Sequence, residues 1–408
     1  MKHFSLRTLL LVLPLLGLLL GGCKKAELDD YYTTDSEPGF AGLGLPRVAL
    51  ATRYAPTEAV PLYVSYAEAD KLRDVTVFQV IGKIDSTVTG TFPANGTYNT
   101  TGGLQVMPVP YTVPATAPNG TLVRVDVTLN FQNGAKRLRR FTYTVAAPAT
   151  LEFATVPPVP TYRNGLAGTA QSEGDIIGYS LILNKGATTT SPLAKAVDSL
   201  TTFYRIGTQP RVRAGVVRNP TTGAANTRTV DATIPRNSNG QPVTFIFEAY
   251  AAVQTLTITA PVIAVTTPTP LATLRTGRIA GGPSVTLDSL AFNLRTGTIE
   301  PAANPATAKD LFLSGTGSNV TISAANNTRF YRATPAQVAA GFYTTPTVNT
   351  VATALYQNTT VADVGTVAAN DVFAVRVRGA EVMLLRILSV KPGSAGAAAR
   401  VRFEYRSL

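Results

Sequence analysis

Alternating apolar and polar residues predict paired strands over much of the chain. Between residues 123 and 131 every second residue is apolar, which places one row of side chains in a core and the other in water. Asn133-Gly134 follows and supplies the positive φ angles of a tight turn. A second alternating run over residues 141–145 then returns along the first. The pattern predicts an antiparallel hairpin.

The same plan recurs about 120 residues later and indicates a duplicated domain. Val80-Ile81-Gly82 matches Arg205-Ile206-Gly207 at an offset of 125 residues, and Asn119-Gly120 matches Asn239-Gly240 at an offset of 120. After the second Asn-Gly pair, residues 243–249 alternate as the first strand does.

Proline-rich runs mark the predicted domain boundaries. Val156 to Pro160 and Thr266 to Pro270 cannot continue a sheet ladder, so they favour stiff, extended connectors. Farther along, residues 373–377, 383–390 and 401–405 predict a closing antiparallel meander.

Two short helices are expected between strands. Thr334-Pro335 combines an N-cap with a first-turn proline, and Gln337 completes a capping box. Ser191-Pro192 offers a similar start before residues 193–197.

Composition agrees with many short strands joined by tight turns. The 408 residues include 33 glycines and 28 prolines, and only 15% are charged. We therefore predict an all-β protein, with two immunoglobulin-like β-sandwiches followed by a C-terminal β-rich domain that contains a short helix. The predicted ranges are 48–148 and 160–265 for the sandwiches and 271–408 for the last domain.

The N-terminus has the pattern of a lipoprotein leader. Lys2 and Arg7 precede an apolar run over residues 9–20, and Leu20-Gly21-Gly22-Cys23 has the form of a lipobox. We predict a signal peptide over 1–22, lipidation of Cys23 and a tether over 23–47. The alternative is an ordinary secretory leader with an incidental cysteine.

The charge balance favours anionic surroundings. The formal net charge is +12, and Lys2 and Arg7 contribute two of the 36 basic residues, so the chain without its leader keeps +10. An exported basic protein is expected near lipid headgroups, lipopolysaccharide phosphate or acidic glycan. No nucleic-acid-binding motif accompanies the charge, so nucleic acid is not a predicted partner.

The supply of catalytic side chains is narrow. The chain has one histidine, His3, and one cysteine, Cys23; the first leaves with the leader and the second is committed to lipid. Histidine-assisted hydrolysis, thiol chemistry and His-ligated or Cys-ligated metals all need groups that are then missing. We expect no enzyme, no cofactor and no metal site, and an enzyme that uses carboxylates alone is the remaining alternative.

Candidate binding residues come from basic clusters and tyrosines. Arginines near the first hairpin and in the terminal meander can meet an anionic polymer, and two tyrosines beside turns can stack on sugar. The alternative for the arginines is a solvated strand face that discourages edge pairing, and for the tyrosines it is core packing. These candidates are Arg137, Arg139, Arg140, Arg376, Arg378, Tyr98 and Tyr111.

Three tripeptides are similar to acceptors for O-glycosylation in exported bacterial proteins. They are Asp85-Ser86-Thr87, Asp198-Ser199-Leu200 and Asp288-Ser289-Leu290, one in each predicted domain. Ser86, Ser199 and Ser289 are the candidate acceptors. Such tripeptides also arise by chance in a threonine-rich chain.

The leader, the tether, the two repeats and the distinct last domain together resemble the multi-domain accessory lipoproteins of outer-membrane glycan-uptake systems. The resemblance implies a non-catalytic, lipid-anchored protein of the outer membrane, exposed at the cell surface, that binds glycan beside an outer-membrane transporter. The chain lacks the tryptophans usual in such sugar platforms. An adhesin or envelope spacer that binds protein partners is the alternative.

Overall fold

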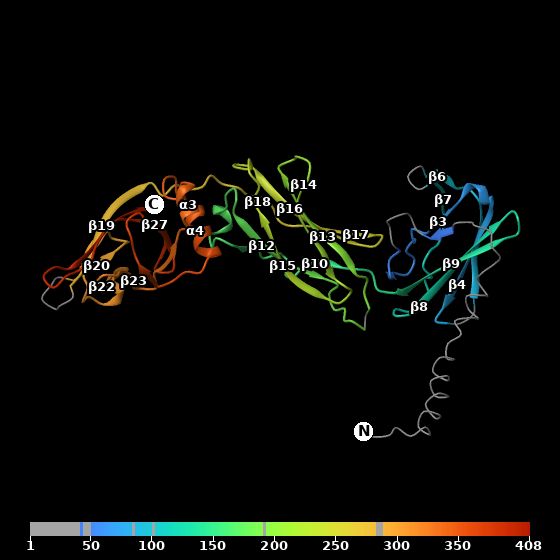
Figure 1. Cartoon of the computed structure of the whole chain (residues 1–408), viewed down its shortest axis with the longest axis horizontal. Coiled ribbons are helices and arrows are strands. Elements are labelled where there is room, and N and C mark those ends of the chain that lie inside the picture. The colour runs from blue at the N-terminus through green and yellow to red at the C-terminus, as the bar shows by residue number, and fades with distance from the viewer. Residues whose placement is uncertain (1–40, 44–49, 84–85, 100–102, 191–192, 283–288) are drawn as a thin grey trace, which may run out of the picture.

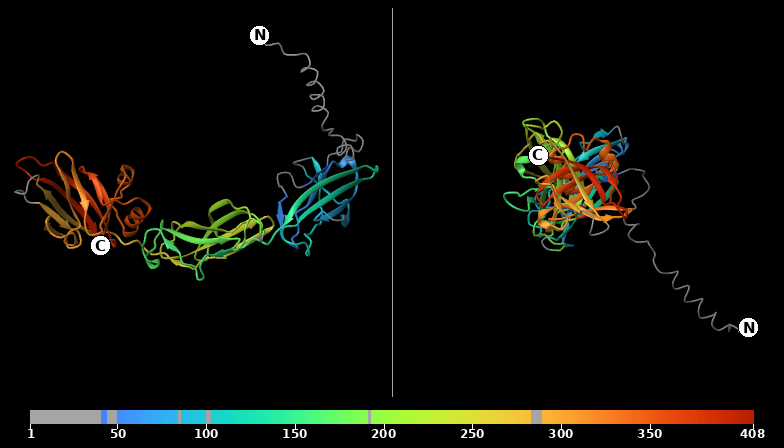
Figure 2. Two further views of the ribbon diagram at one scale, coloured as in Figure 1. Left: turned by 90° about the horizontal axis from the view of Figure 1, so that it is seen from below. Right: turned by 90° about the vertical axis from the view of Figure 1, so that its left-hand side faces the viewer.

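The protein is all-β, with three sheet-built domains arranged in a row (Figure 1). The N-terminal domain lies at one end of the row and the C-terminal domain at the other (Figure 2). The first two domains are immunoglobulin-like sandwiches and the third is β-rich with short helices, so the predicted fold class is confirmed. The computed structural model describes residues 41–43, 50–83, 86–99, 103–190, 193–282 and 289–408.

The first sandwich packs two sheets over one core. The predicted hairpin forms its centre, and Val123 pairs with Tyr143. One sheet has the order β1 (Ala41–Leu43), β3 (Tyr63–Tyr66), β7 (Leu104–Pro108), β6 (Thr97–Asn99). The other has the order β2 (Arg53–Tyr54), β9 (Lys136–Val145), β8 (Leu122–Phe131), β4 (Leu72–Ile81), β5 (Ser86–Pro93). A 3-10 turn, η1, covers Glu68–Asp70.

Strand β1 lies inside the range predicted as tether. Ala41 is buried in the first core and pairs with Tyr66. The first domain therefore begins before residue 48, while Cys23 and the rest of the predicted leader lie outside the described residues.

The second sandwich has the same two-layer plan. In one sheet, β12 (Ile176–Leu183) pairs with β15 (Asn226–Thr233) on one side and with β10 (Leu151–Phe153) and β11 (Thr161–Tyr162) on the other. The facing sheet has the order β14 (Val212–Thr221), β13 (Val197–Ile206), β16 (Pro242–Ala251), β17 (Gln254–Thr259), with β18 (Ile263–Ala264) also paired to β16. A 3-10 turn, η2, covers Gly168–Ala170.

Two sequence expectations differ from this domain. Val156 to Pro160 is a loop between β10 and β11, so the second domain begins before residue 160 and the proline run does not connect domains. Residues 193–197 form no helix, because Ala194 bridges to Ala147 and Val197 begins β13.

Equivalent hydrogen bonds relate the two sandwiches. Ile81 pairs with Val123 as Ile206 pairs with Val243. The amide of Gly120 donates to the carbonyl of Val145 at 2.8 Å, and the amide of Gly240 donates to that of Val265 at 3.0 Å. Residues at matching offsets therefore occupy matching places in both sheets.

The third domain is built on one ten-stranded sheet that closes on itself. The path runs β24 (Arg329–Arg332), β26 (Val372–Val377), β27 (Glu381–Lys391), β28 (Ala399–Ser407), β19 (Thr273–Gly281), β20 (Leu290–Asn293), β22 (Leu311–Thr316), β23 (Val320–Ala324), β25 (Asp363–Thr366), with β21 (Thr298–Pro301) paired to β20. Phe330 and Val361 exchange two backbone hydrogen bonds of 2.9 Å and join the ends of the path. The predicted meander is β26, β27 and β28.

Two helices and a turn complete the third domain. Helix α3 (Pro335–Ala339) begins with the predicted capping box of Thr334 and Gln337. Helix α4 (Val348–Gln357) was not predicted, and it packs on the outer face of β26 and β27 around Val351 and Leu355. Turn η3 covers Ala306–Ala308. Among the described residues, no helix has the length and apolar content needed to cross a membrane.

Polar side chains join the first and second domains. The side chain of Lys195 is 1% exposed, and its Nζ lies 2.5 Å from Oε1 of Glu58 in the first domain. Nδ2 of Asn119 donates to the carbonyl of Leu193 at 2.8 Å. The Arg53 guanidinium donates to the carbonyls of Ala194 and Thr222. The junction is a built contact and not a free linker.

A second polar junction joins the second and third domains. Nδ2 of Asn349, on α4, donates to Asp175 at 2.6 Å and to the carbonyl of Ala170 at 2.9 Å. Thr353, one turn on, donates to the same carboxylate at 3.3 Å. The amide of Thr266 donates to the carbonyl of Gln171 at 2.9 Å, which ties the connecting segment to the second domain. The three domains are therefore held in a row at both contacts.

Candidate binding groove

A groove of about 1060 Å³ lies along the side of the second sandwich. Strands β14 and β15 are edge strands of the two facing sheets, so the space between them opens to solvent. The groove is lined by Gly174, Thr202, Tyr204, residues 213–217 and residues 228–237. We call this surface the lateral groove.

Small residues on β14 keep the lateral groove open. Gly215 pairs with Thr202 of β13, and a Cβ built at Gly215 would have no neighbouring atom within 4 Å. Ala214, beside it, is also exposed. A larger side chain at Gly215 would therefore enter free space in the groove and not the core.

Arg228 has an unusual position in the wall. It pairs with the buried Leu181 and shares its strand face with Val230 and Ala232, which belong to the core. The alternation of β15 therefore turns the Arg228 side chain inward. Its Nε is buried and has no hydrogen-bond partner among the described residues. The residue as a whole is only half-buried and lines the groove, so the part of its side chain at the groove surface can meet an acceptor on a ligand.

The remaining polar groups give the lateral groove a positive character. Arg213, which precedes Arg228 in the sequence, and Arg236, which follows it, are both exposed and line the groove. Asp231 is the one carboxylate in the lining, and it accepts hydrogen bonds from Nε and Nη2 of Arg163 at 2.9 and 2.8 Å. The same hydrogen bonding raises the pKa of Arg163. The groove suits a neutral or anionic ligand that carries hydrogen-bond acceptors.

None of the binding residues predicted from sequence lines this groove. Tyr111 is buried in the first core, and its hydroxyl lies 2.8 Å from that of Tyr143. Burial raises the pKa of both tyrosines. The prediction that Tyr111 binds a ligand is therefore wrong, because no face of its ring is available. Tyr98 is 56% exposed on β6 of the first domain, whereas the groove belongs to the second domain.

The arginines of β9 serve the first domain. Arg140 donates to both carboxylate oxygens of Asp126, at 2.5 and 3.1 Å. Nε of Arg139 donates to the carbonyl of Ala41 and so ties β1 to β9. Arg137 is half-buried and donates to the carbonyl of Lys136 at 3.5 Å. Arg139 and Arg140 are thus engaged in holding the domain, which corrects their prediction as a free binding cluster.

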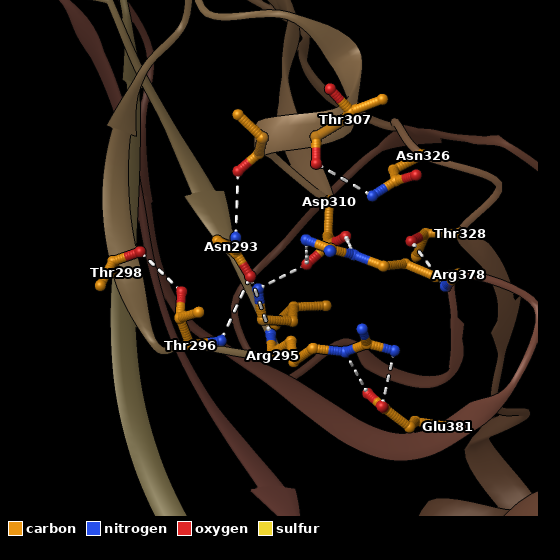
Figure 3. A network of polar contacts seen from close by, with 12 residues as sticks. Asn293, Arg295, Thr296, Thr298, Thr307, Asp310, Asn326, Thr328, Arg378 and Glu381 are labelled. Carbon is orange, nitrogen blue, oxygen red and sulfur yellow. Dashed lines mark hydrogen bonds and ion pairs between the residues drawn. The ribbon is translucent and has the colours of Figure 1, made fainter.

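The two candidate arginines of the meander, Arg376 and Arg378, have different contacts. Arg378 donates to both oxygens of Asp310, whose side chain is fully buried and also accepts from the amide of Leu294 (Figure 3). Arg378 is therefore a structural partner of a buried carboxylate, and its prediction as a ligand contact is wrong. The Arg376 guanidinium nitrogens lie 3.8 Å from the Cβ position of Gly165, so this residue faces the second domain.

The candidate acceptor serines have different surroundings. Ser86 is exposed at the start of β5. Ser199 is half-buried between Tyr250 and Arg218 in the sheet, and the neighbouring Asp198 accepts from the amide of Ala252 at 2.8 Å. Ser289 accepts from the amide of Gly282 at 3.3 Å. Their glycosylation stays a prediction, and Asp85 and Asp288 lie outside the described residues.

No group of three or more His, Cys, Asp or Glu side chains that could hold a metal ion occurs within the part of the chain that the structure describes.

Comparison with known proteins gives no family for the chain. No family and no curated protein matches it. Among solved structures, a DUF4466 family protein from Parabacteroides merdae is similar at 9% identity and a TM-score of 0.23, over 64% of this chain and 100% of that one. An ICAM-5 D1–D4 ectodomain fragment is similar at 12% identity and a TM-score of 0.21, over 91% of this chain and 100% of that one. An α-L-rhamnosidase from Streptomyces avermitilis is similar at 8% identity and a TM-score of 0.20, over 90% of this chain and 36% of that one.

Proposed function

We propose that this protein is a non-catalytic lipoprotein of the outer membrane that binds extracellular glycan in the lateral groove, for uptake through a neighbouring transporter. The position of Arg228 carries the proposal: it faces inward from β15, is half-buried and lines the groove. Glycans supply the hydroxyl, carboxylate or sulfate oxygens that such a donor needs.

The form of the groove supports an extended ligand. It runs between two edge strands and combines the ring of Tyr204 with threonine hydroxyls and three arginines. An aromatic ring beside a few placed polar groups is the usual composition of a site for a small organic unit. A chain of sugar units could lie along the strands and contact Arg213 and Arg228 together.

The groove favours binding over hydrolysis. Glycoside hydrolysis by the usual route needs two carboxyl groups that flank the scissile bond. Asp231 is the one carboxylate that lines the groove among the described residues, and Arg163 already holds it.

Affinity electrophoresis of the full chain in gels that contain single polysaccharides tests glycan binding. We expect one or more glycans to retard the protein, and Arg228→Gln to weaken that binding at least tenfold because it removes the inward donor. Arg218→Gln is the matched control, since Arg218 is exposed on β14 and does not line the groove. Equal loss in both variants, or no retardation by any glycan, would refute the proposed role.

The anchor is tested separately. In cells fed a labelled fatty acid, we expect the label in the native chain and not in a Cys23→Ser variant, which should also keep its leader. Surface exposure predicts that external protease cleaves the protein in intact cells. Membrane attachment without the label in the native chain would contradict the proposed lipidation.

An envelope spacer or adhesin is the second candidate, and the two polar junctions favour it. A buried Lys195–Glu58 pair and the Asn349–Asp175 contact hold three domains in a row, as a projecting arm requires. This role predicts crosslinks from the C-terminal domain to protein partners and no retardation by glycan. Glycan retardation that depends on Arg228 would exclude it as the sole role.

A further inference from the structure

Four basic side chains gather on the outer face of the third-domain sheet. Arg278 of β19 pairs directly with Arg402 of β28, and Arg400 of β28 pairs directly with Lys391 of β27. All four are exposed, while their strand neighbours Ile279 and Val401 are fully buried, so the alternation turns the four outward. We call Arg278, Lys391, Arg400 and Arg402 the cationic face.

The cationic face cannot be explained as protection of a sheet edge. Strand β28 lies between β27 and β19, in the interior of the closed sheet, where no edge is open. Directly opposed side chains on one sheet face have Cβ atoms about 5 Å apart, and like charges there are destabilising. Two such pairs stand side by side here, so the arrangement lowers stability without blocking edge pairing.

The neighbouring acid does not neutralise the cationic face. Glu404, two residues beyond Arg402 on the same strand face, lies 2.6 Å from the Arg386 guanidinium and is engaged there. Within the described part of the chain, none of the four basic residues forms an ion pair. Their charge therefore remains available to a ligand.

The geometry indicates the chemical class of that ligand. The four charges spread over three adjacent strands on a sheet surface, so a single small anion would contact few of them. A polymer with repeated anionic groups can contact all four, and guanidinium groups bind carboxylate or sulfate through two parallel hydrogen bonds. The third domain lies at the opposite end of the row from the N-terminal domain, which favours a polymer outside the envelope over lipid headgroups (Figure 1).

We propose that the cationic face is a binding site for acidic polysaccharide, separate from the lateral groove. The site acts through several charge contacts at once, so its affinity falls steeply with salt. It does not depend on glycan binding in the groove, although its orientation away from the membrane rests on the proposed anchor.

Binding of the full chain, in detergent, to immobilised heparin as a model acidic polysaccharide tests the site. The test variant combines Arg400→Gln with Arg402→Gln, and the control combines Arg205→Gln with Arg218→Gln, two exposed arginines of the second domain. Both variants lose the same net charge. We expect the test variant to bind at least tenfold more weakly at low salt, and its slope of log affinity against log salt to be smaller by about two.

The control variant is expected to stay within twofold of the native affinity. The test variant should also unfold at the same or a higher temperature, because it removes opposed like charges. Equal weakening in both variants, or none in the test variant, would overturn the proposal. So would a test variant that keeps heparin affinity but loses binding to phosphatidylglycerol vesicles, since the site would then serve a lipid surface. Loss of heparin binding in the test variant with unchanged groove binding would separate this site from the groove.

Discussion

The buried Lys195–Glu58 pair should govern the contact between the first two domains. The Lys195 side chain is 1% exposed and that of Glu58 is 15% exposed, with 2.5 Å between Nζ and Oε1. At an effective dielectric constant of 20 the gross attraction is about 7 kcal/mol, most of which offsets the desolvation of the two charges. Removing only one partner leaves the other charge buried, so Lys195→Met should cost about 3 to 5 kcal/mol at this contact.

Hydrogen exchange of the full chain measures that cost locally. The amide of Lys195 donates to the carbonyl of Ala147 at 3.0 Å, and the amide of Ala147 donates to that of Leu193 at 2.7 Å. In Lys195→Met these amides should exchange about a hundred- to several-thousand-fold faster, which is the same free energy at 1.4 kcal/mol per factor of ten. Amides in the core of the third domain should be unchanged.

A double-mutant cycle isolates the pair. Lys195→Met combined with Glu58→Gln should recover at least about 2 kcal/mol relative to the sum of the single changes. The exposed Lys185–Glu152 pair is the matched control, since its side chains are 65% and 35% exposed at 3.0 Å and its coupling should stay below about 1 kcal/mol. Additive effects at Lys195 and Glu58, within about 0.5 kcal/mol, would refute the reasoning.

Three further predictions concern the second and third domains. The Tyr179 hydroxyl is buried without a partner among the described residues, and burial raises its pKa. The unfolded chain therefore ionises first, so the free energy of unfolding is unaffected by this group below the unfolded pKa of about 10 and falls as pH rises beyond it. Tyr179→Phe should therefore leave the melting temperature at pH 7 equal or higher and reduce the loss between pH 9 and 11; a fall at pH 7 would contradict this. Asn349→Ala removes the donor to Asp175 and should cost about 1 to 3 kcal/mol at the second junction, seen as faster amide exchange at residues 170–175 with residues 193–195 unaffected. Arg378→Gln leaves the fully buried Asp310 without its cation and should destabilise the third domain by about 3 to 5 kcal/mol in calorimetry, whereas Arg275→Gln, an exposed control in the same domain, should stay within about 0.5 kcal/mol.

Local patterns were sufficient for much of the fold. The β8–β9 hairpin and the β26–β27–β28 meander follow from alternation and turn residues a few positions apart. The α3 capping box is equally local. The closure through Phe330 and Val361 could not be predicted, because it joins strands whose pairing depends on the whole sheet.

Other differences have identifiable physical causes. Helix α4 contains valine and threonine, which favour strands, and its formation depends on packing against β26 and β27. The proline run at 156–160 predicts a connector between domains but forms a loop within one, because proline excludes a sheet ladder equally well in either place. Tyr111 was misplaced because a tyrosine beside a turn can point to either face.

The lateral groove was missed, although the sequence holds one signal for it. Arg228 stands in phase with Val230 and Ala232, so a charged residue occupies a position that the alternation assigns to the core. The gap between β14 and β15 is set by how two sheets face each other, which no single strand encodes.

The position of β28 determines how the third domain carries a mechanical load. The chain enters this domain through β19, and β28 lies antiparallel to β19 with nine residue pairs from Thr273 and Ser407 to Gly281 and Ala399. Thr273 and Ser407 lie at the same end of this pair, so a load applied at Arg400 and Arg402 and directed away from Thr273 would reach the rest of the protein as shear across the pairs between them. Such a load strains those pairs together, whereas a pull at Ser407 would open them one after another.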